Sequence, residues 1–259
     1  MRSTNLSRRF HHGYTGLILA VATGLTLAGC GASATSPGAA TQQTATGVKV
    51  LWMGDSIAGA QAPALEAALK AAGVAFKNAT PDGGGNVVAG DHEVTAMAAR
   101  DTWKTLKENL ASFRPTVIAY QITTYDWGTA RQQLSAYQKL SRTAADAGAE
   151  LVLVSAPPFK IDDFYKPHEN AIKTAPAMAA KTTHVRYLDA SALWGSDYAA
   201  AKAQRAKDGI HSCQQGSAAF ATWFARQLGE LAGFTPAAPA VWATGRWTGD
   251  ERFAKLGCG

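Results

Sequence analysis

The hydrophobic positions from residue 48 onward follow two alternating patterns along the chain. Short, nearly continuous apolar runs are typical of strands buried in a parallel sheet, and longer stretches with apolar residues three or four positions apart are typical of helices. The short runs predict strands at residues 48–53, 74–76, 116–121, 151–155 and 185–189. The longer stretches predict helices at residues 57–72, 92–112, 129–147 and 214–232.

Strands separated by helices favour an α/β fold, with a parallel sheet of about five strands and helices on both faces. We expect one domain at residues 48–233. Within it, residues 159–181 are polar and irregular in pattern, and we expect them to lie over the carboxyl edge of the sheet. The tail at residues 234–259 is rich in Pro, Trp and Gly. We expect the tail to wrap the domain surface without a strand or helix of its own.

The start of the chain has the composition of an export signal. Arg2, Arg8 and Arg9 form a basic beginning, and this segment contains no Asp or Glu. The apolar stretch at residues 16–28 has the length of a signal-peptide core and is too short to span a membrane. The sequence therefore predicts a signal peptide at residues 1–29. The export route, general secretory or twin-arginine, stays open.

The signal ends in Leu27-Ala28-Gly29-Cys30, which resembles the bacterial lipobox. In that class of signal the cysteine becomes the first residue and carries a lipid. The resemblance therefore implies a lipid anchor on Cys30, at the outer face of the bacterial cell membrane. Residues 30–47, rich in Ala, Ser, Thr, Gly and Gln, then form a flexible tether. The alternative is an ordinary secretory peptide in which the cysteine is incidental.

The composition is that of a globular protein, with 47% hydrophobic and 17% charged residues. The net charge is +6; without the three arginines of the signal, 22 basic residues stand against 19 acidic ones and leave +3. The basic residues do not cluster with aromatic residues as they do in nucleic-acid-binding proteins. We therefore expect no nucleic-acid partner, and contact with the membrane only through the lipid anchor.

The cysteine count predicts one disulfide. With Cys30 lipidated, Cys213 and Cys258 remain, an even pair in an oxidising compartment. A bond between them would tie the tail to the body of the domain. The alternative is two free thiols.

The first candidate for chemistry is Ser56, two residues beyond the predicted first strand. In open parallel sheets, binding sites form at the carboxyl ends of the strands. The pair Asp55-Ser56 at the start of a helix also has the pattern of a helix cap. Ser56 is therefore either a nucleophile at the sheet edge or a capping residue.

A base and its carboxylate partner come from Asp208-Gly209-Ile210-His211, directly before the last predicted helix. Such a turn can place the imidazole of His211 beside the carboxylate of Asp208, which would hold the Nδ1 proton and leave Nε2 free as a base. The alternative is a surface turn with an incidental histidine.

The other histidines of the domain are weaker candidates. We expect His184 to pack locally, and His92 and His168, in polar segments, to be possible contacts of a cleft. None of them has a second His or Cys at metal-ligand spacing. We therefore expect neither a metal nor another cofactor.

Gly54-Asp55-Ser56 after the first strand, together with Asp208 and His211 before the last helix, resembles the SGNH (GDSL-type) hydrolases. The resemblance implies a flavodoxin-like three-layer α/β/α sandwich. It also implies that Ser56 is the nucleophile, His211 the general base and Asp208 the residue that orients the base.

In that family the oxyanion hole uses the N–H of the serine, here Ser56, and a glycine after the second strand. The matching stretch is Asp82-Gly83-Gly84-Gly85-Asn86, in which Gly84 or Gly85 could supply the N–H. Donors of this kind are each worth roughly 3–4 kcal/mol. The alternative for the glycine run is a flexible loop tip.

The third donor of the family is an Asn in the pattern G-x-N-D, and this chain departs from it with Thr123-Thr124-Tyr125-Asp126. Tyr125 occupies the Asn position, and its hydroxyl can donate a hydrogen bond. Gln121, Thr123 or Asn86 could supply the missing donor instead. The aromatic residues Tyr120, Tyr125 and Trp127 are either part of the core or a surface on which a sugar stacks.

The function that the resemblance implies is that of a cell-envelope serine esterase acting on acylated polysaccharide or glycolipid through an acyl-enzyme. The absence of a long apolar stripe favours a carbohydrate O-acyl ester over a lipid. One alternative is an O-acyltransferase to a sugar hydroxyl. The other is a non-catalytic envelope-binding lipoprotein that keeps the fold.

Overall fold

The computed structural model describes residues 45–258. The chain divides into two units, and all of these residues belong to the second, Gln42–Gly259. The predicted signal peptide, the predicted lipid attachment at Cys30 and most of the predicted tether lie outside the described residues. Of the helices in the described part of the chain, none is both long and apolar enough to cross a membrane.

The sheet has five parallel strands in the order β2-β1-β3-β4-β5. They are β1 (Lys49–Met53), β2 (Ala75–Asn78), β3 (Val117–Gln121), β4 (Glu150–Val154) and β5 (Arg186–Leu188). The predicted α/β fold with a five-stranded parallel sheet is thus confirmed. The strand order reverses between β1 and β3, and open α/β sheets bind their ligands at the carboxyl ends of the strands at such a point.

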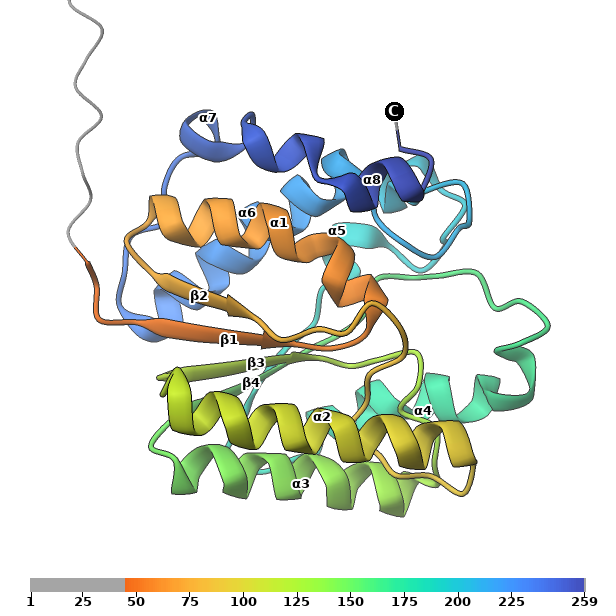
Figure 1. The fold of residues 1–259 in the computed structure, drawn as a ribbon. Helices are drawn as coiled ribbons and strands as arrows, with labels where there is room; N and C mark the ends of the chain where they lie inside the picture. Colours follow the sequence, from red (N-terminus) through yellow and green to blue (C-terminus); the bar gives the residue numbers. More distant parts are fainter. Residues whose placement is uncertain (1–44, 259) are drawn as a thin grey trace, which may run out of the picture. The chain divides into compact units, whose positions relative to one another are not determined.

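Helices cover both faces of the sheet, as Figure 1 shows. On one face lie α1 (Ser56–Ala71), α5 (Ser191–Trp194) and α6 (Gln214–Ala232). On the other face lie α2 (Glu93–Ser112), α3 (Ala130–Asp146) and α4 (Glu169–Ala180). The four predicted helices, which are α1, α2, α3 and α6, thus lie in the two outer layers of a three-layer sandwich.

Side chains of β1 point alternately to the two helix layers. Val50 and Trp52 belong to the buried cluster on the side of α1 and α6, and Leu51 and Met53 belong to the cluster on the side of α2 and α3. Burial on both faces explains why the sequence of β1 is a continuous apolar run. It also fixes the carboxyl end of the strand, which Ser56 follows closely.

The expectation of an irregular segment at residues 159–181 is wrong for its second half. A 3-10 turn, η1 (Lys166–His168), leads into the three turns of α4. Pro176 lies inside this helix. A proline there removes a backbone hydrogen bond, which is why the stretch reads as irregular in the sequence. Burial of Ala175 and Met178 beside α3 holds the helix nevertheless.

The expectation that the tail has no helix of its own is also wrong. It contains α7 (Pro239–Trp242), the 3-10 turn η3 (Arg246–Gly249) and α8 (Glu251–Lys255). α7 and α8 each bury one aromatic side chain. Helices of one turn have too few residues for a hydrophobic period, and their stability comes from tertiary packing.

Candidate active site

Ser56 is the first residue of α1. The side chain of Asp55 caps this helix by accepting a hydrogen bond from the backbone N–H of Ile57 at 2.9 Å. Gly54 has a φ of +156°, and a Cβ there would lie 2.5 Å from the Cβ of Ala58, so this tight turn requires glycine. Asp55 is thus the cap and Ser56 follows it at the sheet edge. The capping and nucleophile interpretations of this stretch are compatible.

Ser56, His211 and Asp208 form one chain of hydrogen bonds. Nε2 of His211 lies 2.9 Å from Oγ of Ser56, and Nδ1 lies 2.6 Å from Oδ2 of Asp208. With a proton on Nδ1, the ring donates to Asp208 and accepts from the Ser56 hydroxyl. In this arrangement a serine can lose its proton to a histidine that a carboxylate orients.

Asp208 also folds the turn that carries it. Its Oδ1 accepts hydrogen bonds from the backbone N–H of Ile210 at 2.8 Å and of His211 at 3.0 Å. Burial alone raises the pKa of Asp208, but hydrogen bonds from the His211 ring and from these two N–H groups outweigh burial and lower the pKa below its ordinary value. Asp208 is therefore an ionised acceptor for His211 at neutral pH.

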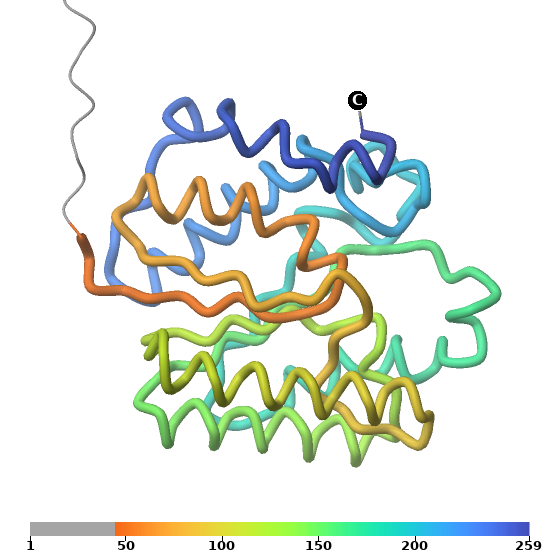
Figure 2. The backbone as a smooth tube through the Cα atoms, viewed as in Figure 1, coloured from red at the N-terminus to blue at the C-terminus, as the bar shows by residue number. Residues whose placement is uncertain are grey.

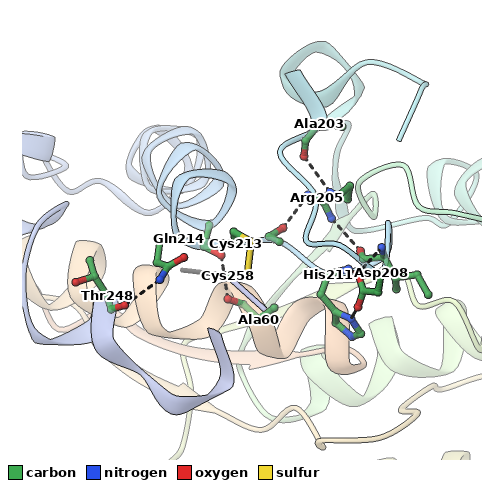
Figure 3. Close-up of a disulfide and its surroundings, with 12 residues drawn as sticks. Ala60, Ala203, Arg205, Asp208, His211, Cys213, Gln214, Thr248 and Cys258 are labelled. Atoms are coloured by element: carbon green, nitrogen blue, oxygen red, sulfur yellow. Dashed lines mark hydrogen bonds and ion pairs between the residues drawn. A yellow bond between two sulfur atoms is a disulfide. The ribbon is translucent and has the colours of Figure 1, made fainter. Parts of the chain in front are cut away.

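Arg205 supports the same turn, as Figure 3 shows, although nothing in the sequence pattern pointed to it. Its Nη1 donates to the carbonyl oxygen of Ile210 at 3.1 Å, and its Nη2 donates to Oγ of Ser212 at 2.7 Å. The guanidinium lies 4.8 Å from the centre of the Trp194 ring. Burial lowers the pKa of Arg205 to about 10, which leaves it charged at neutral pH. The residues on both sides of His211 are thus held by one half-buried cation.

Asp55 joins the serine turn to the loop after β3. Its Oδ2 accepts hydrogen bonds from the backbone N–H of Thr124 at 2.8 Å and from the Thr124 hydroxyl at 2.9 Å. Burial raises the pKa of Asp55, and the hydrogen bonds from Thr124 and Ile57 oppose that rise. Asp55 therefore positions both the Ser56 turn and the loop after β3.

The glycine-rich loop after β2 packs against both of its neighbours. A Cβ on Gly84 would lie 2.9 Å from the ring of Tyr125, and a Cβ on Gly85 would lie 2.5 Å from the carbonyl oxygen of Gly54. Neither position has room for a side chain, so this loop is a packed part of the site. The backbone N–H groups of Gly84 and Gly85 both remain candidates for the second oxyanion donor.

Tyr125 lies at the edge of this site. Its ring is 5.2 Å from that of Trp127, centre to centre. Tyr120 and Trp127 are at most 3% exposed and are core residues, whereas Tyr125 is partly exposed. Burial raises the pKa of Tyr125, and the Tyr165 side chain opposes that rise through a hydrogen bond. The Tyr125 hydroxyl remains a candidate for the third oxyanion donor.

The amide groups of the other candidate donors have different partners. Nδ2 of Asn86 donates to the carbonyl oxygens of Val88 and Thr95, and Nε2 of Gln121 donates to Oε1 of Gln61 at 2.9 Å. Asn86 and Gln121 are at most 1% exposed. Both side chains hold loops and helices together, and the structure does not support them as oxyanion donors.

Asp126 is the acceptor at the centre of a buried network. It accepts hydrogen bonds from the hydroxyls of Tyr120 at 2.9 Å and Tyr137 at 3.0 Å, and from the backbone N–H of Thr123 at 3.0 Å and Val87 at 3.3 Å. Burial raises its pKa to about 6. This network fixes the loop after β3. Asp126 matches the last residue of the family's G-x-N-D pattern, which is the sequence signal that could have pointed to this network.

A cleft of about 350 Å³ opens beside Ser56 and His211. Its walls come from the first turns of α1, the loop after β2, the histidine turn and α8. Five charged residues line it: Asp82, Asp250, Glu251, Arg252 and Lys255. A cleft with these walls suits a ligand rich in hydroxyl groups better than a hydrocarbon chain.

The remaining histidines do not line this cleft. His92 caps α2 by accepting a hydrogen bond at Nδ1 from the N–H of Val94, and the His168 ring stacks on Trp127 at 3.6 Å. Both line a different pocket of about 590 Å³. His184 lies in a turn before β5 with a φ of +58°. Within residues 45–258, no group of three His, Cys, Asp or Glu side chains could hold a metal ion.

Cys213 and Cys258 form a disulfide in the structure, as the cysteine count predicts (Figure 3). Cys213 precedes α6 and follows His211 by two residues. The bond therefore ties the end of the tail to the loop that carries the histidine. A hydrogen bond of 3.1 Å from Nε2 of Gln214 to the carbonyl oxygen of Thr248 adds a second contact.

Comparison with known proteins agrees with this geometry. Residues 28–215 match a family model described as "SGNH domain (fused to AT3 domains)". A search of curated proteins found no match. Among solved structures, an acylhydrolase, by its assigned name, from Bacteroides fragilis aligns with a TM-score of 0.54 at 13% identity, over 74% of this chain and 93% of its own. A GDSL-like lipase from Bacteroides thetaiotaomicron aligns with a TM-score of 0.53 at 13% identity, over 71% of this chain and 88% of its own.

At these identities the two solved structures show a shared fold, whereas the family model covers most of the chain. The match includes the serine turn and the histidine turn, whose side chains lie within hydrogen-bond distance of each other. The chain thus belongs to the SGNH domain family and is a serine ester hydrolase.

Proposed function

We propose that this protein is an exported, lipid-anchored O-acyl hydrolase that removes acyl groups from carbohydrate through an acyl-enzyme. The observation that carries the proposal is the hydrogen-bonded chain from Ser56 through His211 to Asp208 at the edge of a polar cleft.

In the first half-reaction, Oγ of Ser56 attacks the acyl carbon of the ester while its proton passes to Nε2 of His211. The carbonyl oxygen becomes an oxyanion at the N-terminus of α1, where backbone N–H groups favour negative charge. Asp55 takes up the N–H of Ile57, and the N–H of Ser56 is the first donor that the family resemblance assigns to the oxyanion. Gly84 or Gly85, and the Tyr125 hydroxyl, are the further donors.

The tetrahedral intermediate then loses the alcohol. His211 returns the proton to the alcohol oxygen as the bond to the acyl carbon breaks, and the acyl group stays on Ser56. In the second half-reaction a water molecule gives its proton to His211 and attacks the acyl carbon. His211 then returns this proton to Oγ of Ser56 as the bond to the acyl carbon breaks, which releases the carboxylic acid and restores Ser56. Asp208 supports the charged imidazole in both steps.

Several observations favour carbohydrate as the alcohol. Five charged side chains line the cleft. The family resemblance adds an analogy, since relatives attached to membrane acyltransferases act on acylated sugars. Export and lipid anchoring rest on the first 30 residues of the sequence. A disulfide between Cys213 and Cys258 suits an oxidising compartment outside the cytoplasm.

A second candidate function is O-acyl transfer to a sugar hydroxyl. The same polar cleft that receives the departing alcohol could receive an acceptor alcohol, which would attack the acyl-enzyme in place of water. Tyr125 stands where the family has an Asn, so the oxyanion hole differs from that of an ordinary esterase. This difference favours the transferase as a second candidate. A non-catalytic envelope-binding protein would share the fold and lack turnover.

Release of acetate from O-acetylated sugars tests the proposal. Residues 45–259 are incubated with β-D-glucose pentaacetate and with O-acetylated peptidoglycan fragments, and free acetate is measured against Ser56→Ala. Acetate released only by the protein with an intact Ser56 supports the hydrolase. Acetyl ester formed on added methyl glucoside favours the transferase. Folded protein that releases no acetate and forms no ester between pH 6 and 9 contradicts both.

A further inference from the structure

The segment 250–258, here called the tail wall, lies over the Ser56 end of α1, as Figures 1 and 2 both show. It contains α8 and lines the cleft through Asp250, Glu251, Arg252, Lys255 and Leu256. The family model ends its match at residue 215. The tail wall therefore lies beyond the residues that the family model matches.

Arg252 fastens the tail wall to α1 through a carbonyl oxygen that the helix cannot use. In a regular helix the oxygen of Gly59 would accept the N–H of residue 63. Residue 63 is Pro63, which has no N–H. Nη1 of Arg252 donates to the Gly59 oxygen instead, and its Nε donates to Asp250 at 2.9 Å. Because Gly59 is less than one turn beyond Ser56, this contact holds the tail wall close to the serine.

The other end of the tail wall is fixed by the disulfide between Cys258 and Cys213. Between the two anchors, the side chain of Phe253 is 1% exposed and packs in a small cluster with both cysteines. The tail wall is thus held to the serine helix at one end and to the histidine loop at the other. Such a segment has a defined position relative to both reacting groups.

The tail wall lies on the histidine side of Ser56. The cleft that it lines includes Ser56 and His211 but neither Gly84 nor Tyr125, which are candidates to bind the oxyanion. The departing alcohol takes its proton from the histidine and must therefore lie within hydrogen-bond reach of Nε2. The cleft thus corresponds to the alcohol side of the ester.

We propose that the tail wall forms the subsite for the alcohol portion of the substrate and that it selects a polyhydroxylated alcohol such as a sugar residue. The inference rests on the proposed function, because it takes Ser56 and His211 as the reacting groups. Glu251 and Lys255 are the side chains that face the alcohol. Arg252 is a positioning residue that acts by holding the wall.

The charges of the tail wall fit this substrate class. Nζ of Lys255 lies 3.0 Å from Oε1 of Glu251, and both side chains are well exposed. Asp82 lines the same cleft from the loop after β2. Donors and acceptors of both signs can form charge-assisted hydrogen bonds with neutral hydroxyl groups. A hydrocarbon alcohol offers these charged groups no hydrogen bond in exchange for the water it displaces.

The test compares two acetyl esters that differ in the alcohol. kcat and KM are measured for β-D-glucose pentaacetate and for p-nitrophenyl acetate, whose alcohol is a flat phenol. The variants are Glu251→Gln, Lys255→Gln, Arg252→Gln and Arg252→Lys, with Lys107→Gln on α2 as the matched control. We expect the ratio of kcat/KM, sugar ester over phenyl ester, to fall by about tenfold in the first three, mainly through KM. The ratio for Arg252→Lys should lie between those of Arg252→Gln and the wild type. The ratio for Lys107→Gln should equal that of the wild type.

Two results would overturn the inference while leaving the proposed function in place. They are an unchanged ratio in the tail-wall variants and equal losses on both esters. A wild-type protein that cleaves the phenyl ester but not the sugar ester would overturn the carbohydrate part of the proposed function and the inference with it. A wild-type protein that cleaves neither ester, and whose Ser56 does not react with a fluorophosphonate, would overturn the proposed function and the inference with it. Turnover of β-D-glucose pentaacetate by the wild type separates the two cases.

Discussion

Asp55 accepts two hydrogen bonds from Thr124, one from its backbone N–H at 2.8 Å and one from its hydroxyl at 2.9 Å. These bonds connect the residue before Ser56 to the loop that follows β3. The other carboxylate oxygen of Asp55 caps α1. Asp55 of the Gly-Asp-Ser motif therefore links two loops, whereas Ser56 is the residue that reacts.

Replacing Thr124 by Val tests this link. The change keeps the shape of the side chain but removes one of the donors to the buried carboxylate of Asp55, so the free energy of unfolding should fall by about 1–3 kcal/mol. Turnover should fall as well, because the Ser56 turn loses a support. Denaturant unfolding and ester hydrolysis measure the two effects. Thr222→Val, which removes an exposed hydroxyl on α6, is the control. Equal stabilities of the two variants would contradict the link.

Asp208→Asn should lower kcat by about 10³- to 10⁴-fold, because an amide cannot hold the Nδ1 proton of His211 as a carboxylate does. The folded protein should keep its structure through the remaining contacts of Arg205. The rate of p-nitrophenyl acetate hydrolysis is the measurement, with Asp101→Asn on the exposed side of α2 as the control. A loss of less than tenfold would remove Asp208 from the site.

The lowered pKa of Asp208 also predicts a pH dependence of stability. A carboxyl group whose pKa is lower in the folded state stabilises that state above its unfolded pKa, here 3.8, and loses this contribution as the pH falls through the folded value. The difference in unfolding free energy between wild type and Asp208→Asn should therefore be constant above about pH 5 and shrink below the ordinary pKa of 3.8. A difference that grows with acidity would contradict the direction of the shift.

The disulfide predicts both a covalent and an energetic result. Peptide mapping of the exported protein without reduction should find Cys213 joined to Cys258. Replacing both cysteines by serine should lower the free energy of unfolding by about 2–4 kcal/mol, as loss of a disulfide commonly does. Alkylation of both thiols in unreduced protein would contradict the bond.

Tyr125→Phe tests the third oxyanion donor. If the Tyr125 hydroxyl binds the oxyanion, its loss should lower kcat by about tenfold or more with little change in KM. Tyr187→Phe, which removes a half-buried hydroxyl from the edge strand β5, is the control. Equal rates for wild type and Tyr125→Phe would leave only backbone N–H groups as donors.

The parts of the molecule that the sequence predicted are those with local signals. The strands β1, β3 and β4 and the helix at residues 214–232 have strong hydrophobic patterns, and α6 (Gln214–Ala232) begins and ends where its pattern predicts. The Ser56 and His211 turns carry short motifs, each fixed by a neighbouring aspartate. α4 was missed because Pro176 interrupts its pattern, although packing against α3 holds the helix.

The parts that the sequence did not reveal depend on contacts between distant residues or with the backbone. Arg205 binds a carbonyl oxygen and a serine hydroxyl, and neither contact has a sequence pattern. Arg252 binds the carbonyl oxygen of Gly59, 193 residues away, because Pro63 leaves that oxygen free. Only the folded chain shows that the tail lines the cleft.

The most direct test of the account is covalent labelling of Ser56 by a fluorophosphonate. Activation by His211 and Asp208 should make this hydroxyl, among all serines of the chain, the one that reacts, and peptide mass mapping should find the label on Ser56. Ser56→Ala should abolish labelling, and His211→Ala should slow it strongly while the protein stays folded. Folded protein that is not labelled, or that is labelled equally in Ser56→Ala, would contradict the central claim that Ser56 is the nucleophile.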